Sequence, residues 1–292
     1  MQNAVEKLEA GLGAIKRFGR AVVIKYRTVF GVTFFTGLLT YGFVMTNILN
    51  NYDSIVCTPG GYGTGIRSGR WFLTILGNLV GKIWGNYTLP LFNGVFAIFF
   101  ISITVCILVS VLEIKSCALA CIGGMLFISF PALAATMFFM YTVHYYAAAV
   151  FLIVLGVYFA HRRIHGCTIL AACCFALSIG IYQAYMPIAV SLYLLILLRK
   201  GFSCPGLSGR KIFQIGIRYL ISLILGLLFY YGILQIMLLH YVITLGNYQG
   251  VDRMGVIELS EIPEMLKTIY FKFLTLSTQP QYSVNLTKVT RG

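Results

Sequence analysis

One acidic residue stands far from any other in the sequence, and two arginines follow it. Asp53 is the only carboxylate between Glu9 and Glu113, and Arg67 and Arg70 lie in the same polar stretch. A carboxylate near a membrane surface is a suitable general base, because partial desolvation raises the pKa of a carboxyl group. Arginines hold phosphate or pyrophosphate groups through charge-assisted hydrogen bonds. One base and two anion-binding residues predict an enzyme site for a lipid-linked phosphate substrate.

The stretch PGGYGTG at 59–65 lies between the carboxylate and the arginines. Its glycines would let backbone N–H groups approach an anion, but it lacks the Gly-Lys-Ser/Thr ending of a nucleotide-binding P-loop. A purely structural interpretation stays open. Asp53 is then a solvated loop residue, and the arginines extend toward lipid headgroups.

Further polar residues occur where apolar segments end. His144 lies in FFMYTVHYYAAAVF, and Tyr182 and Gln183 lie in GIYQAYMP. Polar residues within membrane segments usually face the bundle interior or a cavity, so these residues and the Asp53 loop predict one cluster at a common membrane level. The alternative is an aromatic belt with hydrogen bonds between helices.

The composition identifies the class of protein. The 292 residues are 59% hydrophobic and 10% charged, whereas soluble domains carry about 25% charged residues. Such a chain cannot cover a surface that faces water, so we predict an integral membrane protein with the lipid bilayer as its partner. The net charge of +14 fits basic residues that flank spans, and it predicts no nucleic-acid partner. Most of the eight cysteines sit in apolar runs and suggest no metal site.

A membrane-spanning helix needs about 20 mostly apolar residues, and seven segments qualify. They are 29–49, 89–112, 117–136, 139–160, 167–183, 186–198 and 219–239. We therefore predict an all-α fold, a polytopic transmembrane helical bundle of about seven spans. Trp71 and Trp84 bracket a segment that is too short to span. Because indole rings favour the membrane–water interface, we expect an interfacial helix at 71–84.

The basic residues predict the orientation in the cell membrane. Most of the 22 lysines and arginines fall in inner segments if the N-terminus is cytoplasmic, as the positive-inside rule requires. Residues 1–28 are then a cytoplasmic, basic, amphipathic segment, and 29–239 form the membrane module. The loop 50–70, with Asp53, and the segment 240–292 face the exterior.

Several motifs in this order resemble one known family. NNYDSI follows the first span, SGRWF opens the interfacial segment, and SIGIYQAYMPIAVSLYL comes later. Together with NYQGVDRMGVIELSEIPEMLKTIYFKFL they resemble the type II glucosyltransferases of bacterial membranes, over about residues 30–275. That family is grouped with the GT-C glycosyltransferases, which share a multi-span helical fold and an exoplasmic acidic residue after the first span.

The resemblance implies transfer of a glucosyl or related sugar from a polyprenyl-phosphate carrier to a surface glycan, such as an O-antigen, outside the cytoplasmic membrane. At the matching positions, Asp53 would be the base that takes the proton from the acceptor hydroxyl. Arg70, in SGRWF, would bind the donor phosphate, with Arg67 as a second candidate. Tyr182 and Gln183, in the matched YQ, would line the substrate site.

Two features depart from the family pattern. Tyr52 precedes Asp53 where GT-C enzymes often carry a second acidic residue. A lone carboxylate makes a poor Mg²⁺ site, so we predict no cofactor and leave a divalent metal open. We expect Tyr52 and His144 to line the substrate site as well. Relatives continue through further spans beyond the position of Gly292, which suggests a truncated product, a fragment or a minimal seven-span module.

Two other functions compete with the enzyme. One is a carrier-lipid flippase or transporter, and the other is a non-catalytic membrane subunit of a glycan-modification system. Replacement of Asp53 separates them, because only an enzyme would lose turnover while it still folds.

Overall fold

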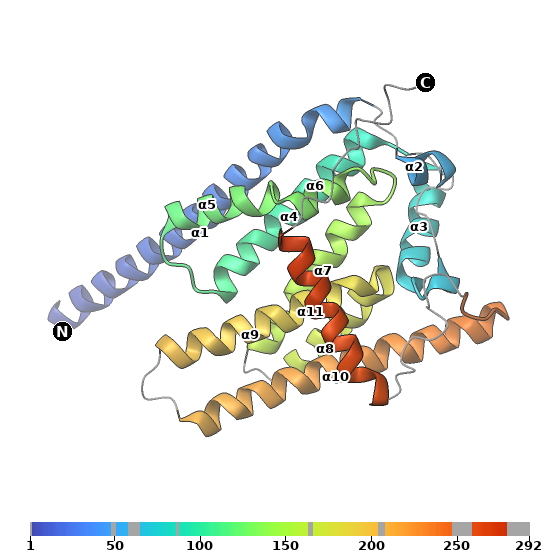
Figure 1. Ribbon diagram of the computed structural model, residues 1–292. Coiled ribbons are helices and arrows are strands. Elements are labelled where there is room, and N and C mark those ends of the chain that lie inside the picture. Colours follow the sequence, from blue (N-terminus) through green and yellow to red (C-terminus); the bar gives the residue numbers. More distant parts are fainter. Residues whose placement is uncertain are drawn as a thin grey trace. The chain divides into compact units, whose positions relative to one another are not determined.

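The computed structural model describes residues 2–47, 51–57, 65–85, 88–162, 166–203, 208–246 and 259–278 (Figure 1). Within these ranges every regular element is helical, as predicted. The chain divides into two compact units, Met1–Leu245 and Gly246–Gly292. The first unit carries all the candidate membrane spans.

Four helices form the first half of the bundle. The long helix α1 (Gln2–Thr46) packs against α4 (Pro90–Val111) and α5 (Cys117–Ile128), and α6 (Pro131–Met137) follows α5. The α5–α6 pair is bent by 49°. The bend precedes Pro131, because proline has no N–H to donate and disfavours helical geometry in the residue before it.

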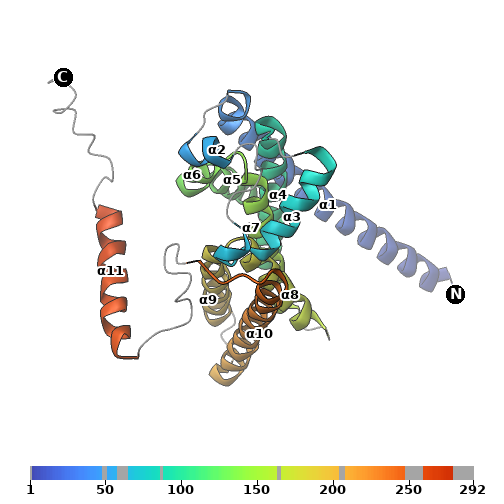
Figure 2. The same cartoon turned by 90° about the vertical axis from the view of Figure 1, so that its right-hand side faces the viewer.

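The second half of the bundle surrounds a short central helix. This helix, α8 (Cys167–Ile181), packs against α7 (Val143–His161) and α10 (Gly209–Tyr241), and α9 (Met186–Ser203) packs against α7 and α10 (Figure 2). Phe175, on α8, is fully buried between two glycines. A Cβ added to Gly156 of α7 or Gly226 of α10 would come within 2.7 Å of Phe175 atoms. The close approach of the three helices therefore depends on residues without a side chain.

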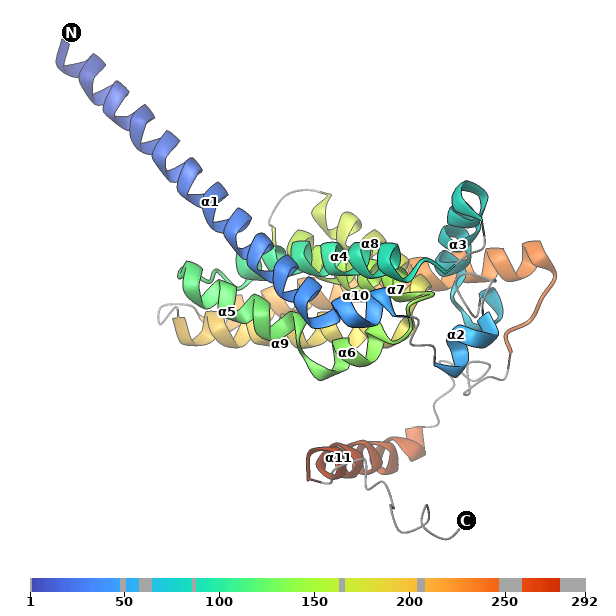
Figure 3. The same ribbon diagram turned by 90° about the horizontal axis from the view of Figure 1, so that it is seen from above.

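Short elements lie at one end of these helices. They are α2 (Tyr52–Cys57), the 3₁₀ turns η1 (Ile66–Ser68) and η2 (Gln183–Tyr185), and α3 (Trp71–Trp84). Figure 3 shows α2 and α3 together at this end, and in Figure 1 α3 runs across the ends of the long helices. The segment predicted as an interfacial helix is thus a helix with the predicted bounds. Its transverse course is that of a helix lying in a membrane surface.

Among the described residues the candidate spans number five or six, whereas seven were predicted. Five helices are long and apolar enough: Val23–Thr46, Pro90–Val111, Val143–His161, Gln183–Phe202 and Gly209–Tyr241. The bent α5–α6 pair makes the sixth. The one remaining predicted span, 167–183, corresponds to α8, which has only 15 residues. It ends where Tyr182 takes up extended backbone geometry, with φ −154° and ψ 115°.

The predicted segment boundaries can be compared with the ends of the helices and of the compact units. The boundary between 1–28 and 29–239 lies inside α1, which is continuous through residue 28. The second compact unit begins at Gly246, near the predicted boundary at 240. In this unit the structure describes η4 (Leu259–Glu261) and α11 (Ile262–Thr278).

Candidate functional site

Arg70 lies at the junction of η1 and α3, where it is the N-cap residue of α3. The preceding Gly69 has φ +75°, in the left-handed region that glycine adopts without strain, and this geometry turns the chain into α3. Arg70 is half-buried, and its Nη1 donates a hydrogen bond to Tyr146 Oη at 3.2 Å. Its guanidinium carbon lies 4.7 Å from the centroid of the Tyr182 ring, which is cation–π geometry.

The charge of Arg70 is incompletely satisfied. Within the described ranges it forms no ion pair, and its buried Nε has no hydrogen-bond partner. A half-buried guanidinium with an open N–H group needs an acceptor, because desolvated charge is costly without one. The group that best matches the planar donors of arginine is a phosphate or carboxylate.

Three tyrosines form the wall beside this arginine. The rings of Tyr146, on α7, and Tyr182 are stacked with centroids 5.0 Å apart. Tyr185, in η2, lies edge-on to both, at 6.3 Å from Tyr146 and 5.2 Å from Tyr182. We call Arg70 and these three residues the Arg70–tyrosine cluster.

A second set of contacts holds the loop that carries Arg70. Gln183 Nε2 donates to Ser68 O at 2.7 Å and to Tyr230 Oη at 3.2 Å. Tyr230, on α10, in turn donates from its hydroxyl to Gly69 O at 3.1 Å. The backbone carbonyls of the two residues before Arg70 are thus tied to α10 and η2, so the position of the guanidinium is fixed.

Asp53 lies in the short helix α2, and it is exposed. Its charge acts on Tyr141, in the turn before α7. Burial is the main cause of the raised pKa of Tyr141, and the negative charge of Asp53 contributes after Cys57 and Tyr146. The charges of Asp53 and Arg70 both act on Tyr146. Asp53 is therefore close to the Arg70–tyrosine cluster, on its exposed side.

Other predicted site residues occupy different surroundings. Arg67, in η1, and Tyr52, in α2, are exposed, and Tyr52 is 79% exposed. His144 lies on α7 two residues before Tyr146 but lines a separate, largely apolar cavity of about 220 Å³ between α3, α4 and α7. The residues 58–64, which include most of the predicted glycine-rich stretch, lie outside the described part of the chain.

An apolar groove reaches the cluster from the lipid side. Its volume is about 640 Å³, and α4, α5, α6, α7 and the start of α9 form its walls. The residues that line it include Gly123, Leu126, Phe130 and Ile188. Tyr185 lines it as well, and a small cavity beside the groove is lined by both Tyr185 and Tyr146. The groove therefore ends at the Arg70–tyrosine cluster.

The sequence alone did not single out Tyr146, Tyr185 or Tyr230. Tyr146 lies in the segment VHYY and Tyr185 in YQAY, but the residues predicted from these segments were His144, Tyr182 and Gln183. Tyrosines are common at membrane interfaces, so their presence carries little signal. Among the described residues, His, Cys, Asp and Glu side chains form no group of three that could hold a metal ion.

Together these features define a polytopic, all-helical membrane protein with a half-buried arginine among three tyrosines, one of which lines an apolar groove. The family model for glucosyl transferase GtrII matches residues 42–289, and the chain belongs to this family. It is therefore a membrane protein of a glucosyltransferase family, as the sequence motifs indicated. No curated protein and no solved structure matches the chain.

Proposed function

We propose that this protein transfers a glucosyl or similar residue from a polyprenyl-phosphate carrier to a surface glycan, such as an O-antigen. The observation that carries the proposal is the position of Arg70. A half-buried arginine without an ion pair in the described ranges belongs to a cluster whose Tyr185 lines an apolar groove. A phosphate attached to a long hydrocarbon chain satisfies both features at once.

In this proposal the carrier lies along the groove. The isoprenoid tail occupies the 640 Å³ between α4, α5, α6 and α9, and the phosphate binds the open N–H groups of Arg70. Tyr182 and Tyr185 line the site where the sugar meets the phosphate. Gln183 has a positioning role, because its amide nitrogen is engaged by Ser68 O and Tyr230.

Asp53 acts as the general base. It takes the proton from the acceptor hydroxyl, whose oxygen forms a bond to the anomeric carbon while the bond from that carbon to the phosphate oxygen breaks. The electron pair of the broken bond stays on the polyprenyl phosphate, where Arg70 stabilises the additional negative charge. The exposure of Asp53 fits an acceptor that is a large hydrophilic glycan. Arg67 is a secondary candidate for the donor phosphate, and Tyr52 and His144 are secondary candidates for lining the substrate site.

The distribution of basic residues supports an exterior site. Arg162, Arg199 and Arg218 lie near the ends of α7, α9 and α10 that are opposite to the Arg70–tyrosine cluster, and Lys25 lies near the corresponding end of the span Val23–Thr46. By the positive-inside rule the basic end is cytoplasmic. We infer a cytoplasmic N-terminus and an exterior Asp53 in the cell membrane.

The test measures donor binding and sugar transfer separately. Membranes that contain the wild-type chain, Asp53→Asn or Arg70→Gln receive polyprenyl-phosphate-glucose and an acceptor glycan, with protein level monitored. We expect Asp53→Asn to bind donor without transfer, and Arg70→Gln to lose donor binding. Lys82→Gln removes an exposed cation from α3, the helix that Arg70 precedes, and serves as the matched control, with donor binding retained.

Two results would contradict parts of the proposal. Equal transfer by wild type and Asp53→Asn would remove Asp53 from the mechanism. Arg70-dependent donor binding without transfer, even by the wild-type chain, would instead support a flippase or a non-catalytic subunit that binds the carrier lipid.

A further inference from the structure

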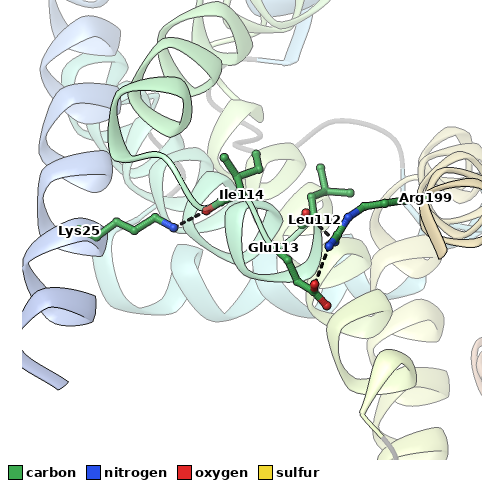
Figure 4. A network of polar contacts seen from close by, with 5 residues as sticks. All are labelled: Lys25, Leu112, Glu113, Ile114 and Arg199. Atoms are coloured by element: carbon green, nitrogen blue, oxygen red, sulfur yellow. Dashed lines mark hydrogen bonds and ion pairs between the residues drawn. The ribbon is translucent and has the colours of Figure 1, made fainter. Parts of the chain in front are cut away.

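A cluster of basic residues lies at the end of the bundle opposite to Arg70. Its centre is the turn after α4, where Glu113 has φ +50°. Arg199, on α9, pairs with Glu113 and donates from Nη1 to Leu112 O at 2.7 Å. Lys25, on α1, donates to Ile114 O (Figure 4). The turn is thus tied to two helices from opposite sides.

The cations around this turn outnumber the carboxylate. The Arg199 hydrogen bond lowers the pKa of Glu113, and the charges of Lys200 and His161 act in the same direction. Arg162 and Arg218 lie close enough to act on His161 in turn. Two helix ends and the start of α10 therefore gather four lysine or arginine side chains around Glu113 and His161, and Arg199 already occupies the one carboxylate.

Arg218 is one of these cations and has a buried donor without a partner among the described residues. It lies within a candidate span and is half-buried, and its Nε is buried without a partner in the described part of the chain. Its Nη2 donates only a long hydrogen bond, 3.4 Å, to His161 O. An ionised side chain at this depth indicates a functional contact, because burial of charge is costly unless an opposite charge is present.

The level of Arg218 in the bilayer follows from the length of α10. The helix has 33 residues, so it is about 50 Å long, whereas the hydrocarbon core is about 30 Å thick. Arg218 is in the third turn, about 14 Å from the start at Gly209, so it falls near the boundary with the headgroups. The exposed Phe202 and Phe213 nearby face lipid at the same end of the bundle.

We propose that Arg218, Lys200, Arg162 and His161 form a binding site for the phosphate of an anionic phospholipid headgroup. The phosphate accepts from the half-buried guanidinium of Arg218 and offsets the excess of positive charge. Bulk lipid of this leaflet is the occupant because the cluster lies at headgroup level beside exposed apolar side chains. Basic pockets between membrane helices bind anionic headgroups in this way.

The experiment uses the full chain, purified in neutral detergent and unfolded by heat, with tryptophan fluorescence as the signal. Phosphatidylglycerol or phosphatidylcholine is titrated into the sample. We expect phosphatidylglycerol to raise the unfolding temperature of the wild type and phosphatidylcholine to have little effect. In Arg218→Gln the apparent affinity for phosphatidylglycerol should fall about fivefold, which corresponds to about 1 kcal/mol for one basic residue near a membrane surface.

Lys211→Gln is the matched control, because Lys211 is exposed on the same helix and should leave the affinity unchanged. If Arg218→Gln does not fold, Lys200→Gln tests the same site. Equal stabilisation by both phospholipids, or equal loss in Lys211→Gln, would overturn the proposal. A third titration uses polyprenyl phosphate, and tighter Arg218-dependent binding of that lipid would assign the site to the carrier and also overturn it.

Discussion

The hydroxyl of Tyr230 offers a sharp test of how Arg70 is held. In Tyr230→Phe the ring stays in place, but Gly69 O loses the hydrogen bond that it accepts at 3.1 Å, and Gln183 loses one acceptor. Tyr230 is only 5% exposed and Gly69 is buried, so water does not readily replace the donor. A buried carbonyl left unsatisfied costs about 1–3 kcal/mol, which lowers the population of the correctly held loop about 5- to 150-fold.

The loss should appear in donor binding, because Arg70 directly follows Gly69. We expect a higher KM for polyprenyl-phosphate-glucose in Tyr230→Phe, measured as the dependence of sugar transfer on donor concentration in membranes. Tyr231→Phe is the matched control, since the neighbouring Tyr231 is 57% exposed on the same helix. Equal donor dependence in the two variants would refute the reasoning. A lower unfolding temperature in Tyr230→Phe with unchanged donor KM would likewise reduce Tyr230 to a structural role.

Three further outcomes follow from the structure. Gly123→Phe should fill the apolar groove and raise the donor KM without unfolding the protein. Gly232→Phe should leave the donor KM unchanged, because a Cβ has open space at both positions but only Gly123 lines the groove. Gly180→Ala should lower the unfolding temperature at a cost of about 1–3 kcal/mol, because its Cβ would lie 2.8 Å from the Trp71 ring. The pKa of Glu113 is lowered in the folded state, so its contribution to stability is present above the ordinary carboxyl pKa and is lost as the pH falls below it. The unfolding temperature measured against pH should therefore fall less steeply in acid for Glu113→Gln than for wild type. Glu264→Gln is the control and should behave as wild type, because the side chains of Glu264 and its ion-pair partner are both more than three-quarters exposed.

The sequence was most informative where one physical requirement dominates. Long apolar runs gave α4 and α7 within a few residues, because a helix in lipid must satisfy its own backbone. Two tryptophans bracketed α3. The segment 167–183 was predicted to span the membrane, but its helix α8 is too short to count as a candidate span. Apolar composition alone does not distinguish a span from a helix buried by its neighbours. Buried Phe175 and Ser178 show that α8 faces protein on several sides.

The candidate site was predictable only in part, for a related reason. Family motifs and charge pointed to Arg70 and Tyr182, and the structure brings these two together. The supporting tyrosines were not predictable, because the side of a helix that faces the site depends on packing. Tyr230 and Tyr231 are chemically identical neighbours, yet one is 5% and the other 57% exposed. Only the exposure of Tyr231 is what a lipid-facing tyrosine of an aromatic belt would show.

The two halves of the proposed reaction are held in different ways, and this difference bears on acceptor choice. Arg70 is fixed by Tyr146 and, through the loop before it, by Gln183 and Tyr230. A donor phosphate therefore meets a preorganised site, which lowers the cost of binding. Asp53 instead stands exposed on a six-residue helix. Substitutions around Arg70 should consequently alter donor use for every acceptor, whereas substitutions on α2 should alter the relative rates with different acceptor glycans.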